Sequence, residues 1–179
     1  MDNDKFEQFV ERYGRDILRF CRITAGDSDV GDELYQDTML KLTEKRDILN
    51  PDQNTKSYAL SISMFLWKNM CRKDISRKKL APMASTDALS DEGWQPEDDR
   101  DNISPEQMYL RQSEIREIQR VVAALPEKYR VPVYLFYSAN TQIAEIAKVL
   151  HIPEGTVKTR MRKAKKMLKK ELEALGYDR

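Results

Sequence analysis

The sequence is short of the residues that build metal centres, disulfide frameworks and membrane spans. Among 179 residues only one is histidine, His151, and only two are cysteine, Cys21 and Cys71. A single histidine is too few for an ordinary Cys/His zinc site, and two cysteines inside helical patterns predict buried, reduced thiols. No stretch approaches the roughly 18 apolar residues that a membrane-spanning helix needs. We therefore expect no metal site, no cofactor and no direct membrane insertion.

Signals for secretion, β-strands and internal repeats are also missing. The chain opens with MDNDKFEQF, which is acidic and lacks an apolar run, so we expect no signal peptide and a cytoplasmic location. No segment alternates apolar and polar residues as a half-buried strand does, and no repeat recurs along the chain. The composition, 40% hydrophobic and 34% charged, is that of a soluble protein rich in charge.

The net charge of +1 conceals a segregation of charge along the chain. Residues 27–37 carry five acids and no base, whereas residues 66–80 carry six bases and one acid. Residues 84–106 carry eight acids and one base, and residues 158–170 carry eight bases and no acid. Two basic blocks with an acidic block between them predict two contacts with a polyanion and a middle segment that avoids it.

The acidic block also marks a domain boundary. Residues 81–106 contain three prolines, one glycine and no periodic apolar positions, so they cannot bury enough surface to offset the entropy of ordering. We predict a flexible acidic linker at 81–106 that joins an N-terminal helical domain, residues 1–80, to a C-terminal one, residues 107–179. Trp94 is the only aromatic residue of this linker, and we favour its docking into a pocket of a partner.

Helical periodicity runs through both predicted domains. Apolar spacing predicts helices near residues 6–21, 30–46, 57–79, 105–124, 126–138 and 141–150, followed by a basic helix. In the third helix the residues expected to face inward are Tyr58, Ile62, Phe65, Leu66 and Met70. Ser28 or Asp29 is the expected N-cap of the second helix, and Pro132 is expected to kink the fifth. The predicted fold class is all-α, in two small helical domains.

The end of the chain carries the most specific motif. TQIAEIAKVL (141–150) is a short amphipathic helix, HIPE turns the chain, and the next helix has one apolar stripe with Lys and Arg on its other faces. Two helices joined by so tight a turn predict a helix-turn-helix, whose second helix fits the DNA major groove. A solvated basic tail is the weaker alternative, because a tail would mix acids among the bases.

His151 stands in this turn, where glycine is usual. A left-handed backbone is costly for a residue with a side chain, although histidine tolerates it better than most types do. We therefore expect His151 to be a turn residue and not a ligand or a catalyst.

A second nucleic-acid signal lies in the helix predicted at 57–79. SMFLWKNMCRKDISRKK places aromatic residues among basic ones, which suits unstacked bases and phosphates, as in single-strand binding. The signal is weak by itself, because half of these aromatic residues can belong to the core. The candidate DNA-binding residues here are Trp67, Lys68, Asn69, Arg72, Lys73, Arg77 and Lys78.

The acidic helix DVGDELYQDTMLKL allows two interpretations. Its carboxylates could form the metal cluster of a nuclease, but no histidine and no second carboxylate group stand nearby in the sequence. Acids near a helix N-terminus are favoured by the helix dipole in any case. A face that docks a protein is therefore the better-supported interpretation.

Taken together, these segments resemble bacterial RNA polymerase sigma factors. DVGDELYQDTMLKL is similar to the polymerase-binding helix of that family, through Asp32, Glu33, Leu34, Gln36 and Asp37. LPEKYRVPVYLFY and EIAKVLHIPEGTVKTRMRKAKKML are similar to its promoter-reading C-terminal domain. With only two domains and a short linker, the chain resembles the extracytoplasmic-function group of the sigma-70 family. His151, Asn140 and Gln142 depart from the residues common at these positions, which are Gly, Gly and Ser.

The resemblance implies a role in promoter-specific transcription initiation and not an enzymatic activity. The residues implied for core RNA polymerase are Asp32, Glu33, Leu34, Gln36, Asp37 and Leu40. The melted −10 element would contact Asn54 in the loop 50–56, together with the basic aromatic helix. The residues implied for the −35 duplex are Thr156, Lys158, Thr159, Arg160, Arg162, Lys163 and Lys166. The acidic linker would thread polymerase channels, and an anti-sigma factor, often membrane-anchored in this group, is an expected partner.

Two rival functions fit the sequence less well. A stand-alone helix-turn-helix regulator would need neither the basic aromatic helix nor the acidic docking helix. A recombinase or nuclease with a DNA-binding tail would need a nucleophile or a metal cluster, and the sequence offers neither. No small-molecule substrate is expected.

Overall fold

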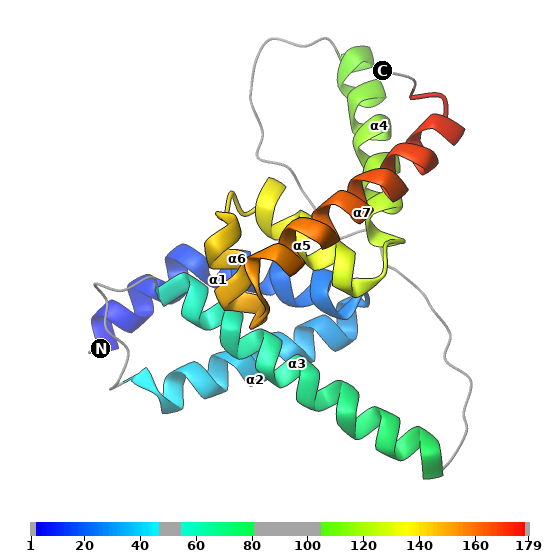
Figure 1. Cartoon of the computed structure of the whole chain (residues 1–179). Helices are drawn as coiled ribbons and strands as arrows, with labels where there is room; N and C mark the ends of the chain where they lie inside the picture. Colours follow the sequence, from blue (N-terminus) through cyan, green and yellow to red (C-terminus); the bar gives the residue numbers. More distant parts are fainter. Residues whose placement is uncertain (1–2, 47–54, 81–104, 178–179) are drawn as a thin grey trace.

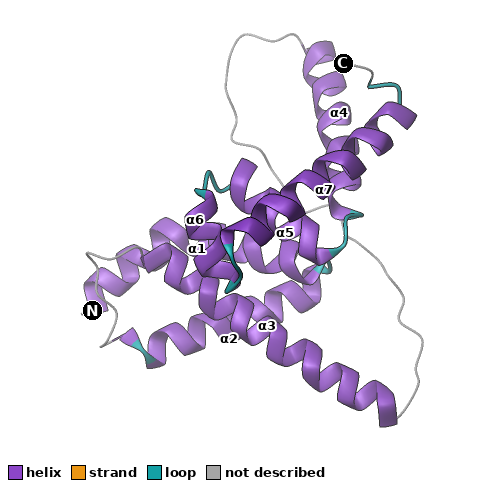
Figure 2. Cartoon of the chain, viewed as in Figure 1, coloured by secondary structure: helices purple, strands orange, loops and turns teal. Residues whose placement is uncertain are grey.

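Seven helices and no strand make up the part of the chain that the computed structural model describes, residues 3–46, 55–80 and 105–177 (Figure 2). The helices are α1 (Asn3–Ala25), α2 (Ser28–Glu44), α3 (Thr55–Leu80), α4 (Pro105–Ala123), α5 (Glu127–Tyr137), α6 (Ile143–Leu150) and α7 (Glu154–Ala174). The side chains of 74–80 and 105–113 are not described. The all-α prediction is confirmed, with α1–α3 as the N-terminal domain and α4–α7 as the C-terminal domain. The predicted linker lies outside the described residues, except that Pro105 and Glu106 begin α4.

A tight connection makes α1 and α2 a helical hairpin. Gly26 ends α1 with a left-handed backbone, φ 75°, which glycine adopts without steric cost. Asp27 is the N-cap of α2, since its Oδ1 accepts from the backbone N–H of Val30 at 3.0 Å; the expected cap was one or two residues later. A Cβ on Gly31 would lie 2.5 Å from the Cα of Arg22. Only glycine therefore lets the two helices come so close.

α3 packs on this hairpin, and the Oγ1 of Thr38 donates to the Oγ of Ser63 at 3.2 Å in the buried contact. The inward prediction is right for Ile62, which is buried, but wrong for Phe65, which is 58% exposed, and for Tyr58, which is 37% exposed. Two different neighbours contact α3, the hairpin and the C-terminal domain. Its apolar residues are spread around the helix for that reason, and a single stripe does not describe them.

Neither cysteine forms a disulfide, and the predicted burial is confirmed for Cys21 but is wrong for Cys71. Cys21 is fully buried in the N-terminal domain, and this burial raises the pKa of its thiol to about 11. Cys71, on α3, is only half-buried.

The C-terminal domain contains the predicted helix-turn-helix. His151 ends α6 with φ 53° and ψ 50°, so the expected left-handed turn is confirmed. Ile146 and Leu150 of α6 pack with Val157 and Met161 of α7 in the core. The preceding helix, α5, follows Pro126 and runs through the buried Pro132 without ending.

The two domains pack against each other, with α5 on α1 and α6 on α3 (Figure 1). The ring of Phe20, in α1, lies 6.3 Å from the ring of Tyr134, in α5. Buried side chains from both domains belong to one hydrophobic cluster. None of the helices in the described ranges is long and apolar enough to cross a bilayer.

Candidate nucleic-acid and protein interfaces

The outward face of α2 presents acids around one large apolar side chain. Glu33, Gln36, Asp37 and Leu40 are exposed, and their spacing of three and four residues places them on one face of the helix. Leu40 is 62% exposed. An apolar residue bordered by charges is the arrangement of a protein interface, with a dry centre and a polar rim.

Two residues predicted for this surface have other roles in the structure. Leu34 is fully buried in the core, so its predicted contact with a partner is wrong. Asp32 is held by Arg22, with Nε to Oδ1 at 2.7 Å and Nη2 to Oδ2 at 3.0 Å. These hydrogen bonds lower the pKa of the Asp32 carboxyl and fasten α2 to α1. A resemblance to a motif does not reveal which of its residues face inward.

The nuclease alternative required a cluster of metal ligands. In the described ranges, no three His, Cys, Asp or Glu side chains come close enough to hold a metal ion.

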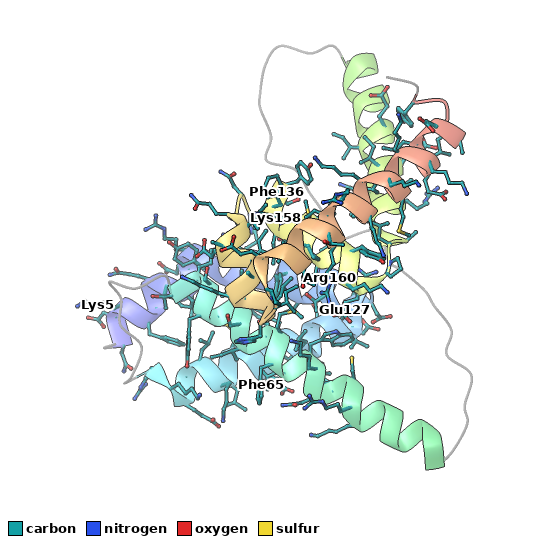
Figure 3. The ribbon with its side chains drawn as sticks, in the orientation of Figure 1. Lys5, Phe65, Glu127, Phe136, Lys158 and Arg160 are labelled. Atoms are coloured by element: carbon teal, nitrogen blue, oxygen red, sulfur yellow. The ribbon has the colours of Figure 1, made fainter. Side chains whose placement is uncertain are left out.

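The basic aromatic segment of α3 faces the C-terminal domain. Trp67, Lys68 and Asn69 are half-buried, whereas Arg72 and Lys73 are exposed. The Nε1 of Trp67 donates to the Oε2 of Glu127 at 3.0 Å, and the Nζ of Lys68 donates to the backbone oxygen of Leu150 at 3.0 Å. Glu127 is labelled in Figure 3, at the start of α5. Asn54 and the side chains of Arg77 and Lys78 lie outside the described residues.

The basic faces of α7 are turned to solvent. Val157, Met161 and Ala164 are buried on the opposite side, so the charged residues between them point outward. The exposed residues among those predicted for this surface are Lys158, Thr159, Arg162, Lys163 and Lys166, and the half-buried ones are Thr156 and Arg160. Lys158 and Arg160 are labelled near the start of α7 in Figure 3.

A hollow of about 360 Å³ lies beside the start of α7. Its lining residues are Lys128, Tyr129, Gly155, Thr156, Thr159, Arg160 and Lys163. Three cationic side chains and the positive end of a helix dipole make this hollow attractive to an anion. The Oγ1 of Thr159 already donates to the backbone oxygen of Gly155 at 2.9 Å.

Sequence reasoning missed the contribution of α5 to this hollow. Lys128 and Tyr129 belong to α5, and α6 lies between α5 and α7 along the chain. The Nζ of Lys128 is 5.1 Å from the centre of the Tyr129 ring. The only signal was a base in the first turn after Pro126, in LPEKYR, and a single base in a helix is too common to interpret.

Comparison with known proteins covers both domains. Residues 9–77 match the family model described as Sigma-70 region 2, and residues 115–168 match the one described as Sigma-70, region 4. The ECF RNA polymerase sigma factor SigW of Bacillus subtilis (strain 168) is 26% identical over 175 residues, which cover 97% of this chain and 92% of SigW. The ECF RNA polymerase sigma factor SigM of Mycobacterium tuberculosis (strain ATCC 25618 / H37Rv) is 27% identical over 177 residues, which cover 98% of this chain and 80% of SigM.

A solved structure shares the fold. It is the sigma factor RpoE in complex with the anti-sigma factor NepR from Bartonella quintana, with a TM-score of 0.75 and 18% sequence identity. The match covers 97% of this chain and 98% of that one. The two family models fall in the order that the two sequence motifs require, one on α1–α3 and the other on α4–α7. The chain belongs to the sigma-70 family of RNA polymerase sigma factors and, within it, to the extracytoplasmic-function group.

Proposed function

We propose that this sigma factor binds core RNA polymerase through α2, reads the −35 duplex with α7 and holds the melted −10 strand with α3. The observation that carries the proposal is the exposed basic surface of α7, the second helix of a helix-turn-helix. The N-terminal domain, residues 1–80, would bind core polymerase and the melted −10 strand. The C-terminal domain, residues 107–179, would read the −35 duplex, and residues 81–106 would join the two domains. A stand-alone regulator is not favoured, since the chain matches both sigma-70 regions.

For polymerase binding, the exposed stripe on α2 supports Glu33, Gln36, Asp37 and Leu40 as the contact residues. Leu40 would supply the apolar centre of the contact, and the two acids would orient the partner and raise the rate of association. Asp32 would act through its bond to Arg22, by holding α2 in place.

For the −35 duplex, the geometry favours a division of labour along α7. The first turns of a recognition helix enter the major groove, so Lys158, Thr159 and Arg162 would face base edges. Arg160 and Lys163, with Lys128 of α5, would hold a phosphate in the hollow beside them. Lys166 lies a turn further on and would contact the backbone.

For the −10 strand, Trp67 offers a ring to stack on and Lys68, Arg72 and Lys73 offer phosphate contacts. Asn54, Arg77 and Lys78, which lie outside the described residues and side chains, remain in this proposal through the resemblance alone. An anti-sigma factor is the further partner that we propose, because the structural neighbour was solved with one.

Reconstituted transcription tests the proposal. The purified chain is added to core polymerase on a library of random promoters, and we expect initiation from a defined sequence class. Reversing two acids of the stripe, Glu33→Lys with Asp37→Lys, should weaken core binding in a pull-down titration. The matched control reverses two exposed acids with the same spacing on α1, Glu7→Lys with Glu11→Lys. Equal losses in both double variants would contradict the α2 assignment, and tight binding to DNA without polymerase would favour a regulator.

A further inference from the structure

A groove of about 540 Å³ lies beside the C-terminal half of α7, next to the hollow at the start of that helix. Its large apolar side chains are Met167, which is 37% exposed, and the half-buried Tyr129 of α5. Its acid is Glu173, which pairs with Lys169 at 3.4 Å. Four lysines line this groove, which we call the lysine groove: Lys163, Lys166, Lys169 and Lys170.

Contact with DNA alone does not account for the lysine groove. The 21 residues of α7 extend about 31 Å, whereas the major groove is about 12 Å wide, so the second half of the helix lies beyond the base edges. Phosphates would attract the lysines there, but they have no use for the exposed Met167. Lysines around a large apolar side chain suit an acidic peptide segment that carries one apolar residue of its own.

The chain contains a segment of this kind. Residues 91–99, DEGWQPEDD, carry five acids and no base around Trp94. They lie outside the described residues. An indole is large and mostly apolar, and it makes favourable contacts with a methionine sulfur. The segment therefore complements the lysine groove both in charge and in its single aromatic residue.

The segment is attached close to the groove. It precedes α4, which packs beside the C-terminal half of α7 (Figure 1). The hydroxyl of Tyr177, just after α7, donates to the Oε2 of Glu117 in α4 at 2.9 Å. The eleven residues from Trp94 to Pro105 span up to about 36 Å when extended, which exceeds the length of α7 itself. Trp94 can therefore reach the groove while α4 stays in place.

We propose that residues 91–99 bind in the lysine groove, with the indole of Trp94 on Met167 and the acids on the lysines. The occupant is a segment of the same chain, and its charge and its point of attachment identify it. The contact is electrostatic at its rim and is weakened by salt.

The docked segment competes with DNA phosphates and not with base edges. Lys166 and Lys170 line the lysine groove, whereas Lys158 and Arg162 line neither this groove nor the hollow at the start of α7. The segment therefore lowers the affinity for every duplex by the same factor and leaves the choice of sequence unchanged. This consequence rests on the proposed function, which gives phosphates to the later lysines of α7.

The fluorescence of Trp94 measures the docking in the full chain. Trp67→Phe leaves Trp94 as the only tryptophan. Acrylamide should quench it about threefold less than it quenches a synthetic peptide of residues 91–99, because a groove buries most of the surface of its occupant. Its emission should also lie at shorter wavelength than that of the peptide. Quenching equal to that of the peptide would overturn the docking.

Two double variants with the same change of charge locate the docking on α7. Lys166→Glu with Lys170→Glu should raise the quenching of Trp94 to the level of the peptide. The matched control, Lys158→Glu with Arg162→Glu, has the same spacing on the same helix, and all four residues are exposed. Circular dichroism shows whether the helices are retained. Equal responses in the two double variants would overturn the lysine groove as the site.

A mixing experiment distinguishes one chain from two. The Lys166→Glu, Lys170→Glu variant is mixed with an excess of a chain that lacks both tryptophans, Trp67→Phe with Trp94→Ala. We expect Trp94 of the variant to remain quenched as in the peptide. Recovery of its protection would make a second copy the host of the segment and would overturn docking within one chain.

Duplex binding measures the competition. Neutralising three acids, Glu97→Gln with Asp98→Asn and Asp99→Asn, should tighten binding to all −35 duplexes about threefold or more at low salt, because two lysines become available to phosphates. The control neutralises three exposed acids of α1, Asp4→Asn with Glu7→Gln and Glu11→Gln.

The two measurements separate failure of the docking from failure of the proposed function. A protected Trp94 with no gain in duplex affinity would support the docking and overturn the phosphate role of Lys166 and Lys170. A gain that differs between duplex sequences would overturn the competition with phosphates alone.

Discussion

At the scale of single residues, the guanidinium of Arg22 makes Asp32 part of the contact between α1 and α2. The carboxylate belongs to an acidic cluster in the sequence, yet two hydrogen bonds turn it toward α1. They favour its ionised form, so its pKa is lower in the folded chain than in the unfolded one. The lowered pKa stabilises the folded chain at pH values above the pKa of the unfolded chain, which is about 3.9. This stabilisation is lost as the pH falls through the pKa of the folded chain.

Asp32→Asn should accordingly lower the free energy of unfolding by about 0.5–1 kcal/mol at pH 7, the usual size for a partly exposed pair. The difference from the parent chain should shrink as the pH falls below about 4 and vanish below the pKa of the folded chain, because the unfolded carboxylate takes up its proton first and the folded one last. Urea titrations at a series of pH values measure it. A difference that stays constant down to pH 2 would mean that the ion pair contributes nothing.

His151 carries a backbone cost that glycine would not. Its φ of 53° lies in the left-handed region, where a side chain costs roughly 1–2 kcal/mol. His151→Gly should stabilise the C-terminal domain by about 0.5–1 kcal/mol after the extra entropy of unfolded glycine is subtracted. Thermal unfolding followed by circular dichroism tests it, and a destabilised variant would reveal a contact of the imidazole that offsets the strain.

At the scale of helices, close approach explains why two glycines in helical segments differ. A Cβ added to Gly31 would lie 2.5 Å from the backbone of α1, at the Cα of Arg22. A Cβ added to Gly155 would have no atom of another part of the chain within 4 Å. Gly31→Ala should destabilise the chain by about 1–3 kcal/mol through overpacking, despite the better helix propensity of alanine. Gly155→Ala, its control, should stabilise by about 0.5–1 kcal/mol. Equal effects in denaturant titrations would mean that α1 and α2 are less closely packed than described.

The position of a basic residue along α7 should determine whether it contacts base edges or only phosphates. Lys158→Ala or Arg162→Ala should change which −35 sequences are chosen, at about 1–3 kcal/mol on the preferred site, because base edges are read near the start of the helix. Lys166→Ala with Lys170→Ala should weaken all promoters alike and flatten the salt dependence by about one unit for each lost phosphate contact. Lys169 is a poorer choice, since it pairs with Glu173 at 3.4 Å. Promoter selections at two salt concentrations decide it, and identical preferences would reject the assignment.

The positions of most helices, and the helix-turn-helix motif, could be predicted from the local sequence. Apolar periodicity, His151 in the turn after its helix, and the absence of acids from residues 158–170 led to the right helices and the right kind of DNA-binding motif. The inward or outward direction of a residue was harder, as Leu34 and Phe65 show, because it depends on which neighbours arrive and from which side. Sequence spacing records the faces of a helix but not how many of them are covered.

At the scale of the whole molecule, the packing of one domain on the other was not predicted. Arg130 looks like an ordinary surface base in LPEKYR, and Glu127 like an ordinary first-turn acid. Their partners lie more than 50 residues away, on helices of the other domain. The hydrogen bonds between the domains are made by single polar side chains, and single polar side chains leave no periodic signal in a sequence.

The covalent connection between the domains sets how this contact responds to concentration. Two halves of one chain meet at an effective concentration in the millimolar range, fixed by the tether and independent of how much protein a cell makes. Dilution of the chain from micromolar to nanomolar should therefore leave the packing of its two domains unchanged, as energy transfer between one label on each domain would measure. A complex of two separate chains with the same contact would dissociate over that range.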